Sequence, residues 1–181
     1  MTKLTQREVS MTKSEINIGS IKIDIDETSN HVVYKISGMV DESFKQDQVP
    51  RIKAQTIVLD LEGLKNFNSC GVREWVFLIR DLEKYGQLRF KNCSIPMVDQ
   101  LNMVPESAGN GIIESFYAPY ACESHGESEY LITLNNDFHD IQAGIAPDVN
   151  CTTCQKPLIF DAMVDSYFLF LTAAKTKKKA S

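Results

Sequence analysis

The chain has 181 residues, of which 43% are hydrophobic and 24% charged; this balance is typical of a soluble protein with one well-cored domain or a domain plus a small appendage. The formal net charge of -5 argues against nonspecific nucleic-acid binding, so we expect no nucleic-acid partner. No long apolar run occurs, since the best stretch, residues 75–79, is far too short to cross a bilayer, and the N-terminal residues lack the apolar centre of a secretory signal. We therefore expect a cytoplasmic protein without a membrane partner.

Both ends of the sequence predict flexible tails. Residues 1–18 are polar and aperiodic, and residues 173–181 include a short basic run that we expect to be solvated. Between the tails, apolar residues alternate or run continuously in five segments that predict strands: 21–25, 32–36, 56–61, 88–93 and 111–117.

Two segments between these strands carry the helical period instead. Apolar residues from Val72 to Leu82 follow the i, i+3, i+4, i+7 spacing, and Gly86 is a natural stop for this helix. Pro96 fits the first turn of a shorter second helix, which Pro105 halts. Strands alternating with helices of this size predict an α/β fold over residues 19–120, a mixed β-sheet with helices packed on it.

The character of the sequence changes after Pro119. Short β-prone pieces at 130–134 and 158–160 are separated by residues 135–150, a loop too long for a compact core without another constraint. We therefore predict a small separate β element at 121–160. Residues 161–172 carry apolar side chains at helical spacing and predict a C-terminal helix that packs back on the body.

A strand, a loop and a helix start follow one another at residues 56–82. The strand ends in Leu59-Asp60-Leu61, and Phe67 precedes Asn68-Ser69-Cys70-Gly71 at the helix start. This order resembles the STAS domains, which include the bacterial anti-sigma-factor antagonists; residues 37–41 and 94–103 are similar to two further segments of that family. The resemblance covers roughly residues 19–117 and implies a STAS-like fold. Asn68 stands where the family has Asp, and Cys70 where it has Ser or Thr.

The resemblance implies a role for the turn at the helix start. In antagonists of this family the first Ser of the turn, here Ser69, is phosphorylated by a partner kinase that is also the anti-sigma factor. A phosphate at a helix N-terminus is stabilised by unpaired N–H groups and the helix dipole. Two interpretations stay open: Ser69 is regulated, or Ser69 or Asn68 simply caps the helix. In either case we expect the surface of Asn68, Ser69, Cys70 and Gly71 to dock a partner.

Cys70 also has two interpretations. Helix N-termini lower thiol pKa values, which would suit a redox-active thiol. The alternative, which we expect, is a small packed side chain.

Two pairs of metal-ligand residues lie in the last third of the chain. Cys122-Glu123-Ser124-His125 and Cys151-Thr152-Thr153-Cys154 each place two residues between the ligands, a spacing that lets a tight turn point both side chains at one metal. Three thiolates and one imidazole predict a closed, structural Zn²⁺ site. Zinc would also explain how the weakly apolar segment 121–160 folds as a zinc-ribbon-like insertion.

Other interpretations of these residues remain. Cys151 and Cys154 would suit a redox dithiol, or the thiols are incidental. His139 is an alternative fourth ligand to His125, although its spacing is irregular, whereas His31 is expected to be an ordinary surface residue. Phe116, Tyr117 and Tyr120 either form an exposed aromatic patch or are buried under the ribbon, as we expect.

The sequence carries no motif of catalysis. It has no Gly-rich phosphate loop, no Ser-His-Asp order and no pair of carboxylates framing a pocket, because Asp60 and Glu62 are expected to be solvated. We therefore expect a non-catalytic bacterial signalling protein whose partner is a kinase-like anti-sigma factor or another signalling protein. The alternative is a structural adaptor whose zinc ribbon mediates assembly into a larger complex. The pattern gives no oligomeric state.

Overall fold

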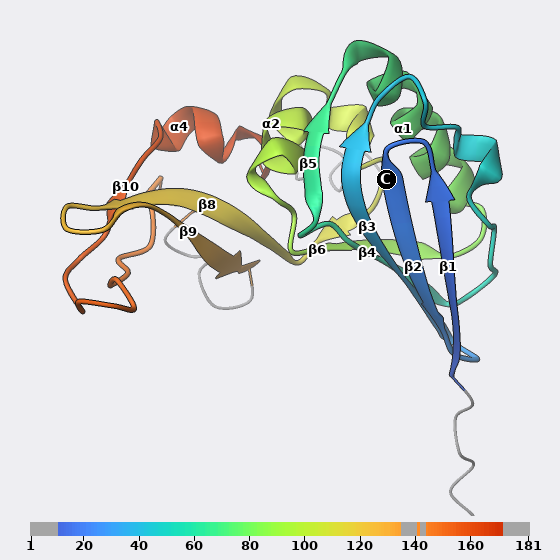
Figure 1. The fold of residues 1–181 in the computed structure, drawn as a ribbon, viewed down its shortest axis with the longest axis horizontal. Coiled ribbons are helices and arrows are strands. Elements are labelled where there is room, and N and C mark those ends of the chain that lie inside the picture. Colours follow the sequence, from blue (N-terminus) through green and yellow to red (C-terminus); the bar gives the residue numbers. More distant parts are fainter. Residues whose placement is uncertain (1–10, 135–140, 142–143, 172–181) are drawn as a thin grey trace, which may run out of the picture.

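The computed structural model describes residues 11–134, 141 and 144–171 of the chain, which form two β-sheets with helices (Figure 1). The main sheet contains β1 (Thr12–Ile18), β2 (Ile21–Glu27), β3 (His31–Val40), β4 (Thr56–Asp60), β5 (Leu64–Phe67), β6 (Gln87–Lys91) and β7 (Ile112–Ile113). Its order is β1-β2-β3-β4-β6-β7, and β5 pairs with the end of β3. β1, β2 and β3 are antiparallel neighbours, whereas β4, β5, β6 and β7 pair in parallel, so the sheet is mixed.

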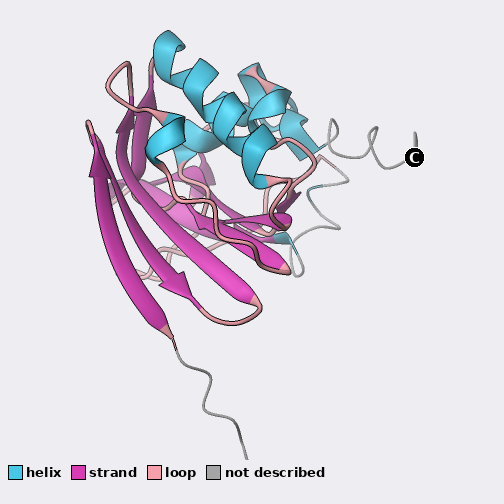
Figure 2. Cartoon of the chain, turned by 90° about the vertical axis from the view of Figure 1, so that its right-hand side faces the viewer, coloured by secondary structure: helices cyan, strands magenta, loops and turns pink. Residues whose placement is uncertain are grey.

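The helices cover one face of the main sheet, as Figure 2 shows. They are α1 (Ser69–Leu82), α2 (Ile95–Met103) and two short 3-10 turns at Gln46–Gln48 and Pro105–Ser107. None of the helices in the described ranges is long and apolar enough to cross a membrane. The predicted α/β fold with a mixed sheet is thus confirmed.

The core lies between this sheet face and α1. Alternate strand residues such as Ile23, Tyr34 and Leu59 are fully buried, because the side chains of a strand point to opposite faces in turn. Trp75 of α1 is also fully buried and donates from Nε1 to the Ser107 carbonyl oxygen at 3.0 Å. The opposite sheet face is polar; Lys35, for example, pairs with Asp26 at 3.0 Å. Apolar burial therefore supplies the main stabilisation of this part of the molecule.

A second sheet extends away from the main one, to the left in Figure 1. It consists of β8 (Ser115–Cys122), β9 (Gly126–Thr133) and the two-residue β10 (Ile159–Phe160), in the order β10-β8-β9. We call residues 115–171 the extension. After β10 the chain forms the short helix α4 (Val164–Tyr167), and residues 169–171 are again helical.

We call the main sheet with its helices, residues 11–114, the body. The C-terminal part of the extension packs on the body through aromatic side chains. The ring of Phe116 lies 6.0 Å from that of Phe168 and 5.1 Å from that of Phe170. The Asn102 amide of α2 donates to the Tyr167 carbonyl oxygen at 2.9 Å and accepts from the Phe170 N–H at 2.8 Å. One side chain thereby satisfies two backbone groups that the break between α4 and residue 169 leaves unpaired.

Several element boundaries differ from those predicted. The N-terminal tail predicted at 1–18 is wrong for Thr12–Ile18, which forms the edge strand β1. Only its last two apolar residues alternate, and a two-residue turn at Gly19–Ser20 folds it onto β2. Residues 1–10 of that tail and the basic tail at 173–181 lie outside the described residues.

The boundary predicted at residue 120 is also wrong, since it cuts through β8. The strand predicted at 111–117 is in fact two strands in different sheets, because the chain leaves the main sheet at Glu114. The single helix predicted at 161–172 begins only at Val164 and is interrupted at Phe168. A continuous apolar pattern cannot distinguish one long element from two short ones whose side chains all enter the same core.

Candidate metal centre and helix-end surface

The four predicted metal ligands meet at the far end of the extension. Cys122 is the last residue of β8 and His125 lies in the turn to β9, while Cys151 and Cys154 lie in the turn that precedes β10. One ligand atom from each of these residues lies within 4.8 Å of all the others. The two turns, which are 25 residues apart in sequence, thus form one group that can bind a metal ion.

The distances within this group are short. Cys122 Sγ lies 3.4 Å from His125 Nδ1 and 3.6 Å from Cys154 Sγ, and Cys151 Sγ lies 3.6 Å from His125 Nδ1. Cys122 and Cys151 are buried, Cys154 is half-buried and His125 is exposed. The group therefore has three thiols directed inward and an imidazole at the rim.

The two ligand turns differ in the hydrogen bond that closes them, which spans three residues in the first and four in the second, but both end in a residue with positive φ. In the first, the His125 N–H donates to the Cys122 carbonyl oxygen at 3.2 Å; in the second, the Gln155 N–H donates to the Cys151 carbonyl oxygen at 2.9 Å. In each turn the residue after the second ligand has a positive φ, which is 80° at Gly126 and 61° at Gln155. Neither residue was predicted from the sequence, although a glycine directly after His125 indicates a turn that needs a positive φ.

Backbone N–H groups also act on the ligand sulfurs. The N–H of Ser124, followed by the imidazole of His125, lowers the pKa of Cys122. The N–H groups of Cys154 and Thr153 lower the pKa of Cys151 to about 6. With a pKa of about 6, Cys151 is favoured as a thiolate at neutral pH, the form that binds a metal, and the lowered pKa of Cys122 shifts that thiol in the same direction.

Aromatic packing supports the sheet behind the metal centre. The buried Tyr120 donates from its hydroxyl to the Pro147 carbonyl oxygen at 2.8 Å, and its ring lies 6.0 Å from that of Tyr130 and 5.4 Å from that of Phe160. Phe116 is fully buried and Tyr117 half-buried, so these aromatic side chains are largely covered, as we expected. The Tyr117 hydroxyl donates to Glu62 at 2.9 Å.

The structure also bears on the other interpretations of the cysteines and histidines. All five cysteines are free, and the pair Cys151 and Cys154 is joined by two further donors that a simple dithiol does not need. His139 lies outside the described residues. His31 is exposed at the start of β3, as expected for a surface residue.

The predicted docking residues lie at the N-terminal end of α1. Asn68 is the N-cap, since its side-chain oxygen accepts a hydrogen bond from the Gly71 N–H at 2.9 Å, and its amide donates to Glu42 at 2.5 Å. Ser69 is the first helical residue and is exposed. Among the described residues its hydroxyl has no hydrogen-bond partner, so the capping role belongs to Asn68.

Cys70 and Gly71 lie on opposite sides of the same turn. Cys70 is exposed, so our expectation that it is a small packed side chain is wrong; residue 70 of an amphipathic helix faces away from the sheet that Gly71 touches. A Cβ atom on Gly71 would lie 1.9 Å from the Val40 carbonyl oxygen. Only glycine therefore lets α1 approach the end of β3 this closely.

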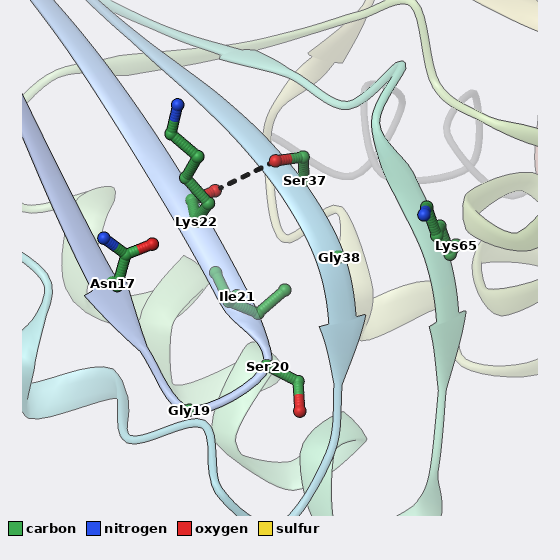
Figure 3. A pocket seen from close by; sticks show the side chains of 8 residues that line it. All are labelled: Asn17, Gly19, Ser20, Ile21, Lys22, Ser37, Gly38 and Lys65. Carbon is green, nitrogen blue, oxygen red and sulfur yellow. Dashed lines mark hydrogen bonds between the residues drawn. The ribbon is translucent and has the colours of Figure 1, made fainter.

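An open hollow of about 270 Å³ lies beside the turn between β1 and β2 and reaches β5 (Figure 3). In Figure 3 the Lys22 side chain extends away from the turn at Gly19 and Ser20, and its ammonium group pairs with Glu15 at 3.1 Å and Asp24 at 3.2 Å. The Ser37 hydroxyl donates to the Lys22 carbonyl oxygen at 3.5 Å. The hollow is open, and two of its polar residues, Lys22 and Ser37, are engaged with neighbouring protein groups, so we interpret it as a surface depression.

Comparison with known proteins finds no family model that matches the chain and no similar protein among those that are curated.

Proposed function

We propose that this chain is a non-catalytic binding module that docks a signalling partner through the exposed N-terminal end of α1, in the manner of the STAS-type anti-sigma-factor antagonists it resembles. The observation that carries the proposal is the exposed run Asn68-Ser69-Cys70 on a helix whose first turn is already capped. A capped helix end does not need the Ser69 hydroxyl for its own stability. That hydroxyl is therefore available to a partner or a kinase.

The rest of the outer face of α1 suits a protein contact. Arg73 and Phe77 are exposed and follow Ser69 and each other at a spacing of four residues, which places all three on one side of the helix. Phe77 is 46% exposed, which is high for a phenylalanine on a helix that otherwise buries its apolar side chains. An aromatic side chain beside a basic one is typical of protein interfaces.

Phosphorylation of Ser69 would change this surface strongly. A phosphate at the first helical position would be stabilised by the N–H groups that Asn68 leaves free and by the helix dipole, and opposed by the Glu42 carboxylate that is bonded to Asn68, while the first turn itself carries no acidic residue. Arg73 lies one turn further along. The added charge would still disfavour an apolar partner at Phe77, because that partner would have to desolvate the phosphate. A phosphate would therefore release the partner without unfolding the helix.

We propose that the metal is zinc and that its role is structural. In a tetrahedral site with Zn–S of about 2.3 Å and Zn–N of about 2.05 Å, neighbouring sulfurs are about 3.8 Å apart and sulfur and nitrogen about 3.6 Å apart. The corresponding distances of 3.6 Å between Cys122 and Cys154 sulfurs, and of 3.4 and 3.6 Å to His125, fit this geometry. Four protein ligands leave no open position for a substrate.

Cys70 offers a direct test of the docking proposal. It is the exposed thiol of the chain, because Cys93 is fully buried and the other three thiols would be bound to zinc. A thiol-reactive photocrosslinker on Cys70 in the zinc-loaded protein should therefore capture the partner from a lysate of the source cells. Mass spectrometry should identify a kinase-like or sigma-regulatory protein whose capture is lost with Ser69→Glu and kept with Ser69→Ala.

Two controls make this test decisive. Ser29→Glu adds the same charge in the exposed turn between β2 and β3 and should leave capture unchanged. A partner captured equally by wild type and Ser69→Glu would contradict the phosphorylation part of the proposal. A partner lost only when Cys151→Ser removes the metal would instead favour the adaptor function.

A further inference from the structure

The strand β9 forms an edge of the second sheet. Among the described residues it pairs only with β8, on one side, while β8 lies between β9 and β10. Residues 127 and 129–131 are exposed, and residue 128 is half-buried. The outer side of 127–131 therefore presents backbone N–H and C=O groups that a further strand can pair with.

The side chains along this edge alternate in a way that selects a partner. Glu127, Glu129 and Leu131 point to one face of the sheet, opposite Ala121, Pro119 and Tyr117 of β8. On the same face Ile159 of β10, opposite Ala121, is 58% exposed, and Leu131 is 37% exposed. The face thus combines two carboxylates about 7 Å apart along the strand with exposed apolar side chains.

The charge around the edge is strongly of one sign. The described part of the extension has a single lysine, Lys156, which contacts Ser124. The carboxylates in the same ranges are Glu123, Glu127, Glu129, Asp148, Asp161 and Asp165. For Glu127 and Glu129 the structure gives no ion pair among the described residues. These two carboxylates are therefore available to form ion pairs with a positively charged partner.

We propose that the edge of β9 binds an extended, lysine-rich peptide segment of a partner protein as an added strand. Backbone hydrogen bonds along 127–131 hold the peptide, and lysines at alternate positions pair with Glu127 and Glu129. An apolar residue further along the same peptide face contacts Leu131. This surface belongs to the second sheet, so its function is independent of the docking at Ser69.

A second copy of the chain fits this edge less well. In an antiparallel pair of two β9 strands centred on Ser128, Glu127 of one copy would lie opposite Glu129 of the other. Like charges directly opposite each other destabilise a strand pair. Lysines in an added strand avoid this repulsion, and for this reason we assign a basic peptide as the occupant.

The test uses the full-length, zinc-loaded protein and a fluorescent nonapeptide, Lys-Thr-Lys-Thr-Val-Thr-Lys-Thr-Lys, as the probe, which places its lysines and its valine on one face of an added strand. Fluorescence anisotropy should show saturable binding that weakens at least tenfold when Glu127→Gln and Glu129→Gln are combined. Hydrogen exchange of the amides of residues 127–131 should slow when the peptide is bound. The control Asp47→Asn with Glu106→Gln removes two exposed carboxylates from the body and should leave the affinity unchanged.

Three results would overturn the proposal. The first is equal binding by the double Gln variant, whose zinc content shows whether it is folded. The second is equal binding of a probe N-methylated at alternate residues, which cannot form the backbone hydrogen bonds of an added strand. The third is tighter binding by a chain ending at Leu171, which would assign the edge to the protein's own lysine-rich C-terminal segment.

Discussion

The body and the extension are stabilised by different kinds of interaction. The body buries large side chains such as Trp75, Tyr34 and Phe90 completely between one sheet face and α1. At its outer end the extension consists of one three-stranded sheet and short turns, and the side chains of Ile159 and Leu131 are exposed on its surface. There the side chains that come together are the four potential metal ligands, whereas in the body they are the apolar side chains of the core.

This difference shows how far a small β element can extend from its core. Near Phe116 the extension still shares the aromatic core of the body, through Phe168 and Phe170. Farther out, the aromatic packing continues from Phe168 through Phe160, whose ring lies 5.5 Å away, to Tyr120, and beyond them the ligand turns have little apolar surface to bury. We infer that hydrophobic burial stabilises the part of the extension near the body, and that metal coordination stabilises its outer end.

Metal removal should separate the two regions most strongly. Structural zinc in small peptides contributes about 10 kcal/mol or more to folding, so chelation at neutral pH should unfold the outer extension. Hydrogen exchange should then become fast for residues 118–133 and 144–160 while β2, β3 and β4 stay protected. Cys151→Ser should give the same pattern, and Cys70→Ser, which removes an exposed thiol, should give none. Unchanged protection after complete metal removal would contradict a structural role.

A deletion in the body core should act on the whole molecule instead. Trp75→Ala removes a fully buried ring and its hydrogen bond to Ser107, so it should cost about 3–5 kcal/mol in the free energy of unfolding. Ile159→Ala removes a side chain that is 58% exposed and should cost less than about 0.5 kcal/mol. Urea unfolding of the zinc-loaded proteins measures both. Equal losses would mean that the extension has a core of its own.

The cap of α1 connects stability with the docking surface. Asn68→Ala should lower the free energy of unfolding by about 1 kcal/mol, because it removes the acceptor of the Gly71 N–H. Asn68→Ser keeps a capping oxygen and should lose only a few tenths of a kcal/mol, whereas Asn68→Asp caps but places a second carboxylate beside Glu42 and should lie between Asn68→Ser and Asn68→Ala. Thermal unfolding of the four proteins tests the order. If Ser69→Ala proves as costly as Asn68→Ala, Ser69 is the cap and the docking proposal loses its main support.

An ion pair that joins a loop to α1 should make the body sensitive to pH. The hydrogen bonds from Lys84 and then Arg51, whose Nε lies 2.6 Å from the carboxylate, lower the pKa of Asp81 below its usual value. A folded pKa below the unfolded one stabilises the protein above the unfolded pKa, and this stability is lost as the pH falls through the folded pKa.

The variant Asp81→Asn should therefore be less stable than wild type by about 1 kcal/mol at pH 6, since solvent screens this partly exposed group. The difference should shrink as the pH falls below about 4. Urea unfolding at a series of pH values measures it. A difference that stays constant down to pH 2 would show that the charge of Asp81 does not contribute.

The smallest expected effects lie in the ligand turns. Gln155 adopts a φ of 61°, where an L-residue is disfavoured by about 1 kcal/mol, so Gln155→Gly should stabilise the zinc-loaded extension slightly. Gly126→Ala should destabilise it by about the same amount, although no atom lies within 4 Å of the added Cβ. Zinc competition with a chromophoric chelator should detect both shifts. Opposite signs would mean that the turns relax when the metal binds.

Several elements of the body were predicted well because their apolar residues repeat regularly, with the period of a strand or of a helix. The alternation at 21–25 and 32–36 and the helical stripe from Val72 to Leu82 correspond to β2, β3 and α1. The four ligands were also predictable, since two ligands separated by two residues in a tight turn can reach one metal ion wherever the two turns lie in the sequence. The edge strand β1 was missed because an edge strand is half exposed and carries too few apolar residues for a clear period.

By itself, the sequence determined the residue types: the apolar residues that fill one sheet face, the Asn-Ser-Cys-Gly helix start, and three thiols with an imidazole in two short turns. Only the tertiary structure decided how they are used. It turned Cys70 outward and Gly71 against Val40, sent the chain into a second sheet at Glu114, and left one edge of β9 without a described partner. Local patterns specify which side chains are apolar or can bind a metal, whereas exposure and strand order depend on contacts between residues distant in sequence, which no local pattern contains.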